Sequence, residues 1–270
     1  LDWLGEAWGP AARNFVVRGT PFARGEVLRS LLDQGAAEVG DATQCHAIAV
    51  DGRAPQFDGG IVTRLDAVPY SIVVNRLAER FYDEGEDIWP KRYAIWGRLI
   101  AQQPDQIAWA ICDARARHLF MPSVYPAIEA DDLTTLADRT GLDPQALEAT
   151  VAGFNAACRS EDRFDPSGLD GCGTADLAIP KSNWARGLRI PPFSAWPLRP
   201  GITFTYLGVR VDAQARVRTA TGGAFDNVFA AGEMMAGSIL GQGYLAGFGM
   251  AIGAVFGRLA GEGAARHVGH

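Results

Sequence analysis

The stretch Asn227-Val-Phe-Ala-Ala-Gly-Glu233 restricts the possible fold classes more than any other part of the sequence. Its first five residues have the pattern of a short buried strand, which Gly232-Glu233 ends. A glycine-rich loop follows over residues 237–249, and residues 250–265 have the spacing of a helix. This order is typical of open α/β sheets, in which ligands bind at the carboxyl ends of strands and helix N-termini favour negative charge. We expect either an anionic ligand at this helix start or a packing loop without one.

The same segment has two other interpretations, which the sequence disfavours. Residues 237–257 carry no charge, but they include seven glycines and Gln242, and Glu233 and Arg258 flank them closely. The run Gly241-x-Gly243-x-x-Ala246 is close to the dinucleotide fingerprint, yet no strand directly precedes it. We therefore expect a helix that packs on a sheet, with no membrane span and no primary nucleotide site.

The composition is that of a globular protein. The 270 residues are 48% hydrophobic and 21% charged, and the net charge is −6 at pH 7. These values exclude a disordered or collagen-like chain. Because the chain has no overall basic charge, we expect no nucleic-acid partner.

The cysteines and histidines are not spaced as metal ligands. Cys45, Cys112, Cys158 and Cys172 form no C-x-x-C pair, and the four histidines are scattered. We expect no metal site, and reduced thiols in a cytoplasmic protein. The chain starts at Leu1 without a basic segment before an apolar one, so we expect no signal peptide. A start within a longer protein is also open.

Hydrophobic periodicity predicts alternating helices and strands. Residues 1–36 have helical spacing, with Thr20-Pro21 as the start of a second helix and Gly35 as its end. The break at residues 140–144 separates two helices within 131–158. Further predictions are strands at 46–50, 61–63 and 70–75, a helix followed by a strand within 92–117, and a long loop over 159–182.

Two C-terminal segments resemble the flavin motif of a known family. Phe225-Asp-Asn-Val-Phe-Ala-Ala-Gly-Glu233, followed by Val255-Phe-Gly-Arg-Leu-Ala-Gly-Glu262, resembles the C-terminal motif of the succinate dehydrogenase/fumarate reductase flavoprotein family. Residues 44–46, 80–87 and 142–151 agree with it. The chain most resembles FAD-dependent tricarballylate dehydrogenases and the related flavoprotein of precorrin ring contraction.

The resemblance implies a fold and a domain division. The expected fold class is α+β / α/β, with a capping (substrate) domain inserted into the C-terminal remnant of a Rossmann-like FAD-binding domain. Residues 1–45 and 205–270 would be flavin-domain segments, and residues 46–204 the capping domain. The family's N-terminal G-x-G-x-x-G is absent from this sequence. The expected partners therefore include the missing N-terminal nucleotide-binding half.

The resemblance also implies residues that hold the FAD. Glu233, after Gly232, matches an acid that contacts the ribose or ribityl chain. A helix start matches the segment that touches the flavin pyrimidine edge, which becomes negative on reduction; it comprises Gly247, Phe248, Gly249 and Met250.

Substrate roles follow in the same way. His46 and Thr63 match a histidine and a threonine that hold substrate, although His46 also suits a core position and Thr63 a strand. Arg92 is the candidate for proton transfer, with Arg98 second. An arginine can act as a base only if its pKa falls far below about 12.5. Arg92 could instead pair with the acidic run 83–87, which we expect to be a solvated face.

Three positions depart from the fumarate reductase pattern. This chain has Phe204 where the family has a second substrate-binding histidine, and Tyr244 where the family has a substrate-clamping arginine. It has Arg64 where the family has the carboxylate of a proton relay. We keep Tyr244 as a substrate-binding candidate, with packing as its alternative. Fumarate reduction is therefore not expected.

The resulting expectation is an FAD-dependent dehydrogenase that acts on a small polycarboxylate such as tricarballylate. Hydride would pass to flavin N5, and an electron-acceptor protein is a possible partner. Two alternatives stay open: flavin-dependent oxygenation of a precorrin in cobalamin synthesis, and a non-catalytic ligand-binding fragment.

Overall fold

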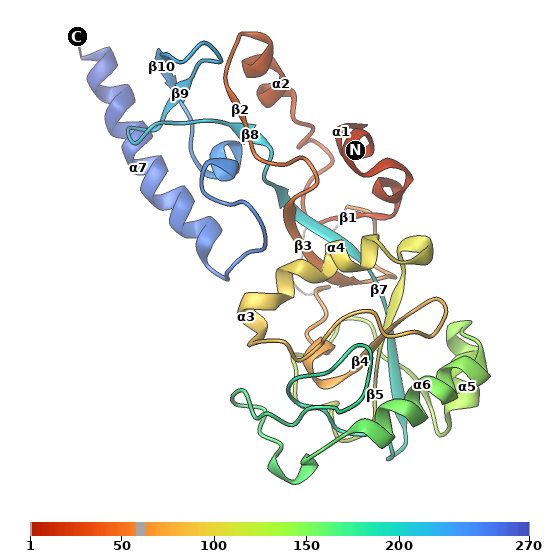
Figure 1. Cartoon of the computed structure of the whole chain (residues 1–270). Helices are drawn as coiled ribbons and strands as arrows, with labels where there is room; N and C mark the ends of the chain where they lie inside the picture. Colours follow the sequence, from red (N-terminus) through yellow and green to blue (C-terminus); the bar gives the residue numbers. More distant parts are fainter. Residues whose placement is uncertain (1, 58–62, 270) are drawn as a thin grey trace. The chain divides into compact units, whose positions relative to one another are not determined.

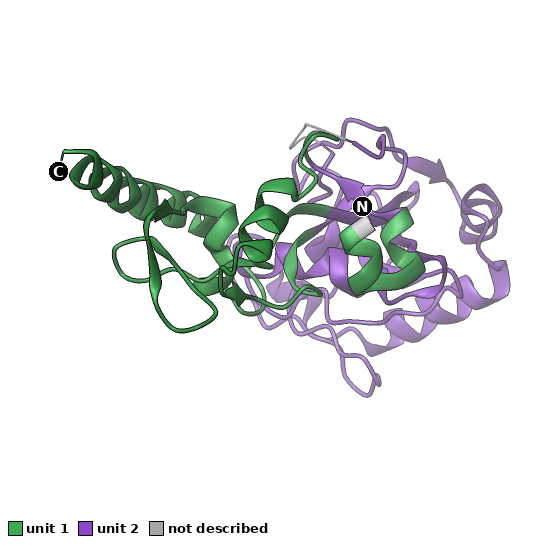
Figure 2. Ribbon diagram, turned by 90° about the horizontal axis from the view of Figure 1, so that it is seen from above, with its two compact units in different colours: residues 1–13, 19–47, 202–270 green, residues 14–18, 48–201 purple. Residues whose placement is uncertain are grey.

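The computed structural model describes residues 2–57 and 63–269. The chain divides into two compact units, which Figure 2 colours separately. The first unit comprises residues 1–13, 19–47 and 202–270, and the second comprises residues 14–18 and 48–201. Each unit has a hydrophobic core of its own. The domain boundaries of the whole protein stay a prediction.

The second unit is built on antiparallel strands. β4 (Ile72–Asn75) pairs with β5 (Ala108–Cys112), and β5 pairs with β7 (Phe193–Thr205). The register places Ile111 opposite Ile72 on one side and Ala195 on the other. Three more strands pair with β7 to complete the six-stranded sheet: β1 (Val16–Val17), β3 (Cys45–Asp51) and β6 (Ile128–Ala130).

The helices α5 (Leu133–Thr140) and α6 (Pro144–Ala157) confirm the predicted helix pair. The carboxylate of Asp132 accepts the Thr135 N–H at the start of α5, and Asp143 caps α6 in the same way. Gly141 ends α5 with a φ of 74°, which a residue with a Cβ rarely adopts.

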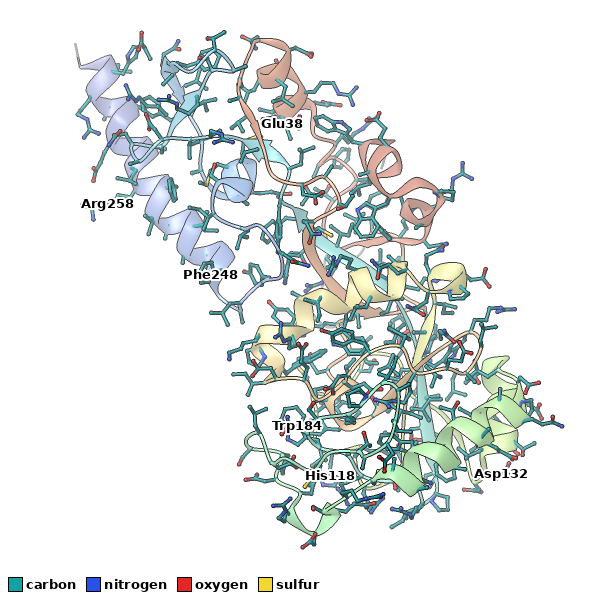
Figure 3. The ribbon with its side chains drawn as sticks, in the orientation of Figure 1. Glu38, His118, Asp132, Trp184, Phe248 and Arg258 are labelled. Carbon is teal, nitrogen blue, oxygen red and sulfur yellow. The ribbon has the colours of Figure 1, made fainter. Side chains whose placement is uncertain are left out.

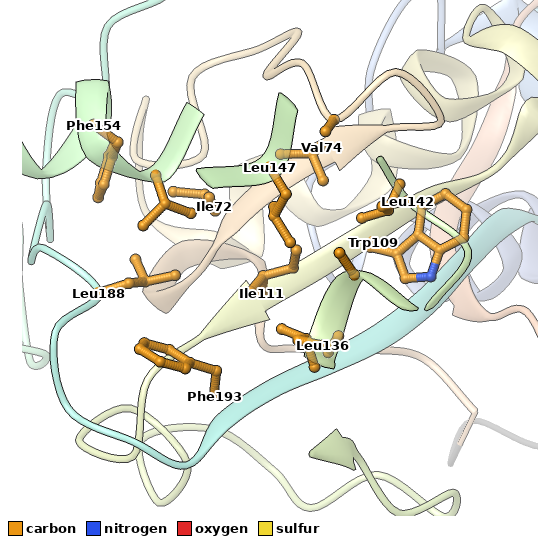
Figure 4. Close-up of a cluster of buried hydrophobic side chains, with 14 of the residues drawn as sticks. Ile72, Val74, Trp109, Ile111, Leu136, Leu142, Leu147, Phe154, Leu188 and Phe193 are labelled. Carbon is orange, nitrogen blue, oxygen red and sulfur yellow. The ribbon is translucent and has the colours of Figure 1, made fainter. Parts of the chain in front are cut away.

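One core lies between these helices and the sheet. Figure 4 shows Leu136 of α5 and Leu147 of α6 facing Ile111 of β5. All three side chains are fully buried. Alternation along β5 places Trp109 and Ile111 in this core, whereas Ala108, Ala110 and Cys112 belong to the core on the opposite face.

The opposite face of the sheet is covered by two short helices. These are α3 (Trp89–Arg92) and α4 (Trp96–Ala101), which η3 (Tyr93–Ile95) joins. The ring of Trp96 is buried, and Phe81 and Tyr82 meet it edge-on at centroid distances of 5.9 Å each. The other short helices of this unit are η2 (Val68–Tyr70), η4 (Pro104–Gln106) and η5 (Glu161–Arg163).

The first unit contains two small antiparallel sheets and a long helix (Figure 1). β2 (Glu38–Val39) pairs with β8 (Gly208–Val209), and β9 (Arg216–Arg218) pairs with β10 (Ala224–Phe229). The helix α7 (Phe248–Val268) packs against η6 (Gly232–Ser238). The other helices of the first unit are α1 (Asp2–Trp8), η1 (Gly9–Asn14) and α2 (Glu26–Asp33). Tyr206, Met235 and Ile252 lie in its core.

Two predicted elements differ from the structure. The second N-terminal helix begins at Glu26 and not at Thr20-Pro21, because Thr20 Oγ1 accepts the Phe22 N–H in a turn and Gly25 adopts a φ of 76°. The strand predicted at 227–231 is present as part of β10, but β10 ends at Phe229 and is only half-buried, with Asp226 and Asn227 exposed, so its predicted burial is wrong. Within the described residues β10 pairs with β9 alone, and α7 packs against it.

None of the helices in residues 2–57 and 63–269 combines the length and apolar character needed to cross a membrane. The predicted strand at residues 61–63 lies outside the described residues except for Thr63.

Candidate functional site

The glycine loop before α7 exposes backbone. Gly243 and Gly247 of this loop have φ values of 71° and 92°, Gly232 at the start of η6 has a φ of 67°, and open space lies where a Cβ would stand at each. The helix α7 starts at Phe248, which Figure 3 labels at the N-terminal end of the helix. Its N-cap residue is Gly247, which has no side chain to form a capping hydrogen bond. The Phe248 N–H already donates to the Leu245 carbonyl oxygen at 3.1 Å. The helix start therefore offers a ligand chiefly the positive end of the helix dipole.

Tyr244 fixes the first turn of this helix. Its hydroxyl oxygen accepts the Gly249 N–H at 2.7 Å. A Cβ on Gly249 would lie 2.9 Å from that oxygen, so the Tyr244 hydroxyl would have to shift if this residue had a side chain. The sequence marks both residues as candidates, but nothing in their spacing indicates this bond between them.

Glu233 lies at the start of η6, the element against which α7 packs. Burial raises the pKa of its carboxyl group above the ordinary value, and the Thr205 backbone N–H donates to the carboxylate and offsets part of that rise. Glu233 is exposed, so its carboxylate is accessible to the hydroxyl groups of a ligand, from which it can accept hydrogen bonds.

His46, Phe204 and Tyr244 form an aromatic cluster in the first unit. The ring centroid of His46 lies 4.1 Å from that of Tyr244 and 5.5 Å from that of Phe204, and Phe204 and Tyr244 are 5.8 Å apart. His46 is only 5% exposed. The structure thus brings together two predicted substrate residues and the aromatic that stands where the resemblance expects a second histidine.

Thr63 and Arg92 belong to the second unit. Thr63 is buried, and its backbone carbonyl accepts the Asp51 N–H at 2.9 Å. Arg92 ends α3, and its Nε lies 3.1 Å from Glu86 Oε2. The pairing with the acidic run, which the sequence leaves open for Arg92, is therefore present. Arg98 lies on α4.

Glu84 shows that the acidic run is not wholly a solvated face, as the sequence suggests. Its carboxylate is buried and pairs with Arg80 at 2.5 Å, and it accepts the Val73 N–H at 2.8 Å. Lys181 is also buried, and its Nζ donates to the Ser71 carbonyl oxygen at 2.5 Å. The sequence does not predict the burial of Glu84 or Lys181, because the identity of a charged residue does not indicate whether its side chain is buried.

No group of metal-ligating side chains occurs in the described part of the chain. The four cysteines are free thiols, of which Cys45, Cys112 and Cys172 are buried and Cys158 is half-buried. Burial raises the pKa of Cys112 to about 12, which keeps that thiol protonated.

The mixed α/β fold matches those of flavoproteins. A solved flavocytochrome c3 fumarate reductase in its open conformation superposes with a TM-score of 0.67 and 22% identity, over 98% of this chain and 44% of that one. This likeness concerns the fold alone.

The family model described as FAD binding domain matches residues 4–249, and the chain belongs to this family. FAD is the cofactor of this family, and the family members related to this chain are FAD-dependent oxidoreductases.

Two curated relatives illustrate the similarity. A probable fumarate reductase of Shewanella frigidimarina (strain NCIMB 400) is 32% identical over 62% of this chain and 27% of its own length. A 4-oxocyclohex-2-ene-1-carboxylate 5-dehydrogenase of Sinomonas cyclohexanicum is 30% identical over 80% of this chain and 39% of its own length. The chain therefore spans less than half the length of these relatives.

The residues of the first unit fit FAD. Glycine backbone borders open space at the start of α7, where a negative ring edge would meet the positive end of the helix dipole. Glu233 supplies a carboxylate on the element packed against that helix.

Proposed function

We propose that this chain is the flavin-contacting and substrate-binding part of an FAD-dependent dehydrogenase that acts on a small polycarboxylate such as tricarballylate. The observation that supports it best is the exposed glycine backbone that precedes α7, a helix of 21 residues. Two hydrogens would leave adjacent carbons, so that a C=C bond forms next to a carboxylate.

Each proposed residue has a distinct task. Gly232 and Glu233 would hold the sugar chain of the cofactor, and the helix start formed by Gly247, Phe248, Gly249 and Met250 would face the flavin pyrimidine edge. Bound FAD would supply the acceptor for hydride. His46, Thr63 and Tyr244 would bind and orient substrate, which holds the reacting atoms near contact distance. Arg92 is the candidate group for proton transfer.

The proposal includes partners outside the described chain. A nucleotide-binding half would grip the adenosine diphosphate part of FAD, and an electron-acceptor protein would reoxidise the flavin. A cytoplasmic location remains part of the proposal.

The test uses the full-length protein. We expect it to carry FAD and to reduce a redox dye when tricarballylate is added. Arg92→Gln should nearly abolish turnover while FAD remains bound. Absence of flavin absorbance in the full-length protein would contradict the proposed function, and unchanged turnover of the variant would remove Arg92 from the mechanism.

A second candidate is dehydrogenation of a ring that carries both a ketone and a carboxylate. It is supported by the aromatic faces of Phe204 and Tyr244, which replace the expected cations and suit an uncharged ring. The relative from Sinomonas cyclohexanicum acts on such a compound by its name. Dye reduction with 4-oxocyclohexane-1-carboxylate but not with tricarballylate would favour this candidate.

The other two alternatives remain predictions. Oxygen consumption with a corrinoid precursor would support oxygenation of a precorrin. A non-catalytic fragment would remain colourless after FAD addition and would bind a ligand without turnover.

A further inference from the structure

A cavity of about 310 Å³ lies in the second unit, between β7 and the segment over residues 117–129. Three aromatic side chains line it, which are Phe120, Tyr125 and Trp196. The rings of Phe120 and Trp196 meet edge-on, with their centroids 5.5 Å apart. Small-molecule sites begin at about 300 Å³ and are lined mainly by apolar and aromatic side chains with a few polar groups. The cavity therefore suits a single ring with a short substituent.

Two buried polar groups lie on one face of β7 at this cavity. Ser194 and Trp196 are two residues apart on the strand, so their side chains lie on the same face. Ser194 is fully buried and Trp196 is 5% exposed. Within residues 2–57 and 63–269, neither Ser194 Oγ nor Trp196 Nε1 has a hydrogen-bond partner. Because a buried donor without an acceptor is unfavourable, a ligand atom that accepts from both would stabilise this face.

The charged groups beside the cavity already neutralise one another. Arg117 and Glu129 both line it and form an ion pair, with side chains 44% and 38% exposed. Arg53 lies over the Tyr125 ring at 5.1 Å from its centroid, and this guanidinium pairs with Asp51 at 2.7 Å. A charged ligand would compete with these pairs, whereas an uncharged ligand leaves them intact.

We propose that this cavity binds an uncharged small molecule that carries a flat ring and a carbonyl oxygen. The ring would lie against Phe120 and Tyr125. The carbonyl oxygen would accept the Trp196 Nε1–H and the Ser194 hydroxyl proton, since its two lone pairs allow both bonds. None of the lining residues belongs to the flavin or substrate residues proposed above, so this site is independent of the proposed dehydrogenation.

A first experiment observes the indole group directly, with benzamide as the probe. The chain has seven tryptophans, and Trp196→Phe identifies the indole signal of Trp196 in the nitrogen–proton NMR spectrum of the purified chain. We expect benzamide to shift this signal saturably. The Trp184 indole, which already donates to the Asp165 carbonyl oxygen at 3.0 Å, should keep its position. A Trp196 signal that benzamide leaves unmoved would overturn the proposal.

A second experiment measures benzamide affinity by calorimetric titration. Trp196→Phe and Ser194→Ala should each weaken binding by about 2–10-fold, which corresponds to the loss of one hydrogen bond. Tyr125→Leu removes a half-buried ring of the wall, leaves β7 unchanged and should also weaken binding. Ser167→Ala, which changes an exposed serine outside the cavity lining, should bind as wild type does.

Two further probes test the chemical class of the ligand. Benzoate has the same ring with a negative charge, and toluene has the ring without a carbonyl oxygen, so both should bind more weakly than benzamide. Benzoate binding as tight as that of benzamide would overturn the assignment of an uncharged ligand. Equal affinity for toluene, or equal benzamide affinities of wild type, Trp196→Phe and Ser194→Ala, would overturn the roles of the two polar groups.

Discussion

Gly249 and Tyr244 depend on one another at the start of α7. We expect Gly249→Ala to destabilise the chain, because the new Cβ would lie 2.9 Å from the Tyr244 hydroxyl oxygen and would displace it from its hydrogen bond with the Gly249 N–H. The matched control is Gly253→Ala on the same helix, where open space lies in place of the Cβ. Alanine there should be neutral or stabilising by up to about 1 kcal/mol.

Urea denaturation of both variants measures the difference. The free energy of unfolding of Gly249→Ala should lie below that of Gly253→Ala. Equal values would show that the hydrogen bond to Tyr244 does not constrain this turn.

Lys181 predicts a dependence of stability on pH. Burial lowers the pKa of its amine to about 8 from the ordinary 10.5. The unfolded chain therefore binds more protons than the folded chain between these pH values, so the contribution of Lys181 to the free energy of unfolding rises with pH across this window and is lost as pH falls through 8. Lys181→Met should remove this slope.

The comparison is made by urea denaturation at several pH values between 7 and 10.5. Lys91→Met is the matched control, because Lys91 is half-exposed and pairs with Asp87 at the surface. If the free energies of unfolding of wild type and Lys181→Met differ by a constant amount over this range, the amine is not titrating in the folded chain.

At the scale of elements, α6 shows how a cap defines a helix. Asp143 accepts the Ala146 N–H at 2.7 Å, and Pro144 follows as the first helical residue. We expect Asp143→Ala to lower the free energy of unfolding by about 1 kcal/mol. Asp131→Ala, an exposed acid outside the helices, is the control and should have little effect.

Thermal unfolding followed by circular dichroism would measure both variants. Leu147 of α6 is part of the core that this helix covers. Loss of the first turn of α6 should therefore lower the midpoint temperature of unfolding of the whole second unit. A midpoint as low for Asp131→Ala as for Asp143→Ala would contradict the capping argument.

At the scale of the whole molecule, α7 exposes apolar side chains in its first turns. Met250 is 83% exposed and Val255 57% exposed, and both precede Arg258, which Figure 3 labels on the same helix. Exposed apolar patches mark surfaces that another part of a protein covers. We expect the isolated chain to bind an apolar fluorescent dye, and the double variant Met250→Gln, Val255→Gln to bind less.

Leu77→Gln in the second unit is the control for a single exposed apolar side chain, which is 56% exposed. It should leave the fluorescence nearly unchanged. If the double variant binds as much dye as wild type, the dye site lies elsewhere and α7 does not carry the patch.

The sequence by itself determined the elements whose signals are local. Asp132, Gly141 and Asp143 mark helix ends by their own backbone chemistry, and runs of apolar residues are enough to predict β3, β4 and β5. The glycine loop before α7 is equally visible, since glycine alone adopts its positive φ values without strain.

Only the tertiary structure decided which distant residues meet. His46 lies beside Tyr244, and Lys181 reaches the Ser71 carbonyl oxygen, across separations in sequence that no periodicity encodes. The burial of Glu84 and the choice of Glu86 as the partner of Arg92 likewise follow from packing, because identical acidic residues in one run differ only in what surrounds them.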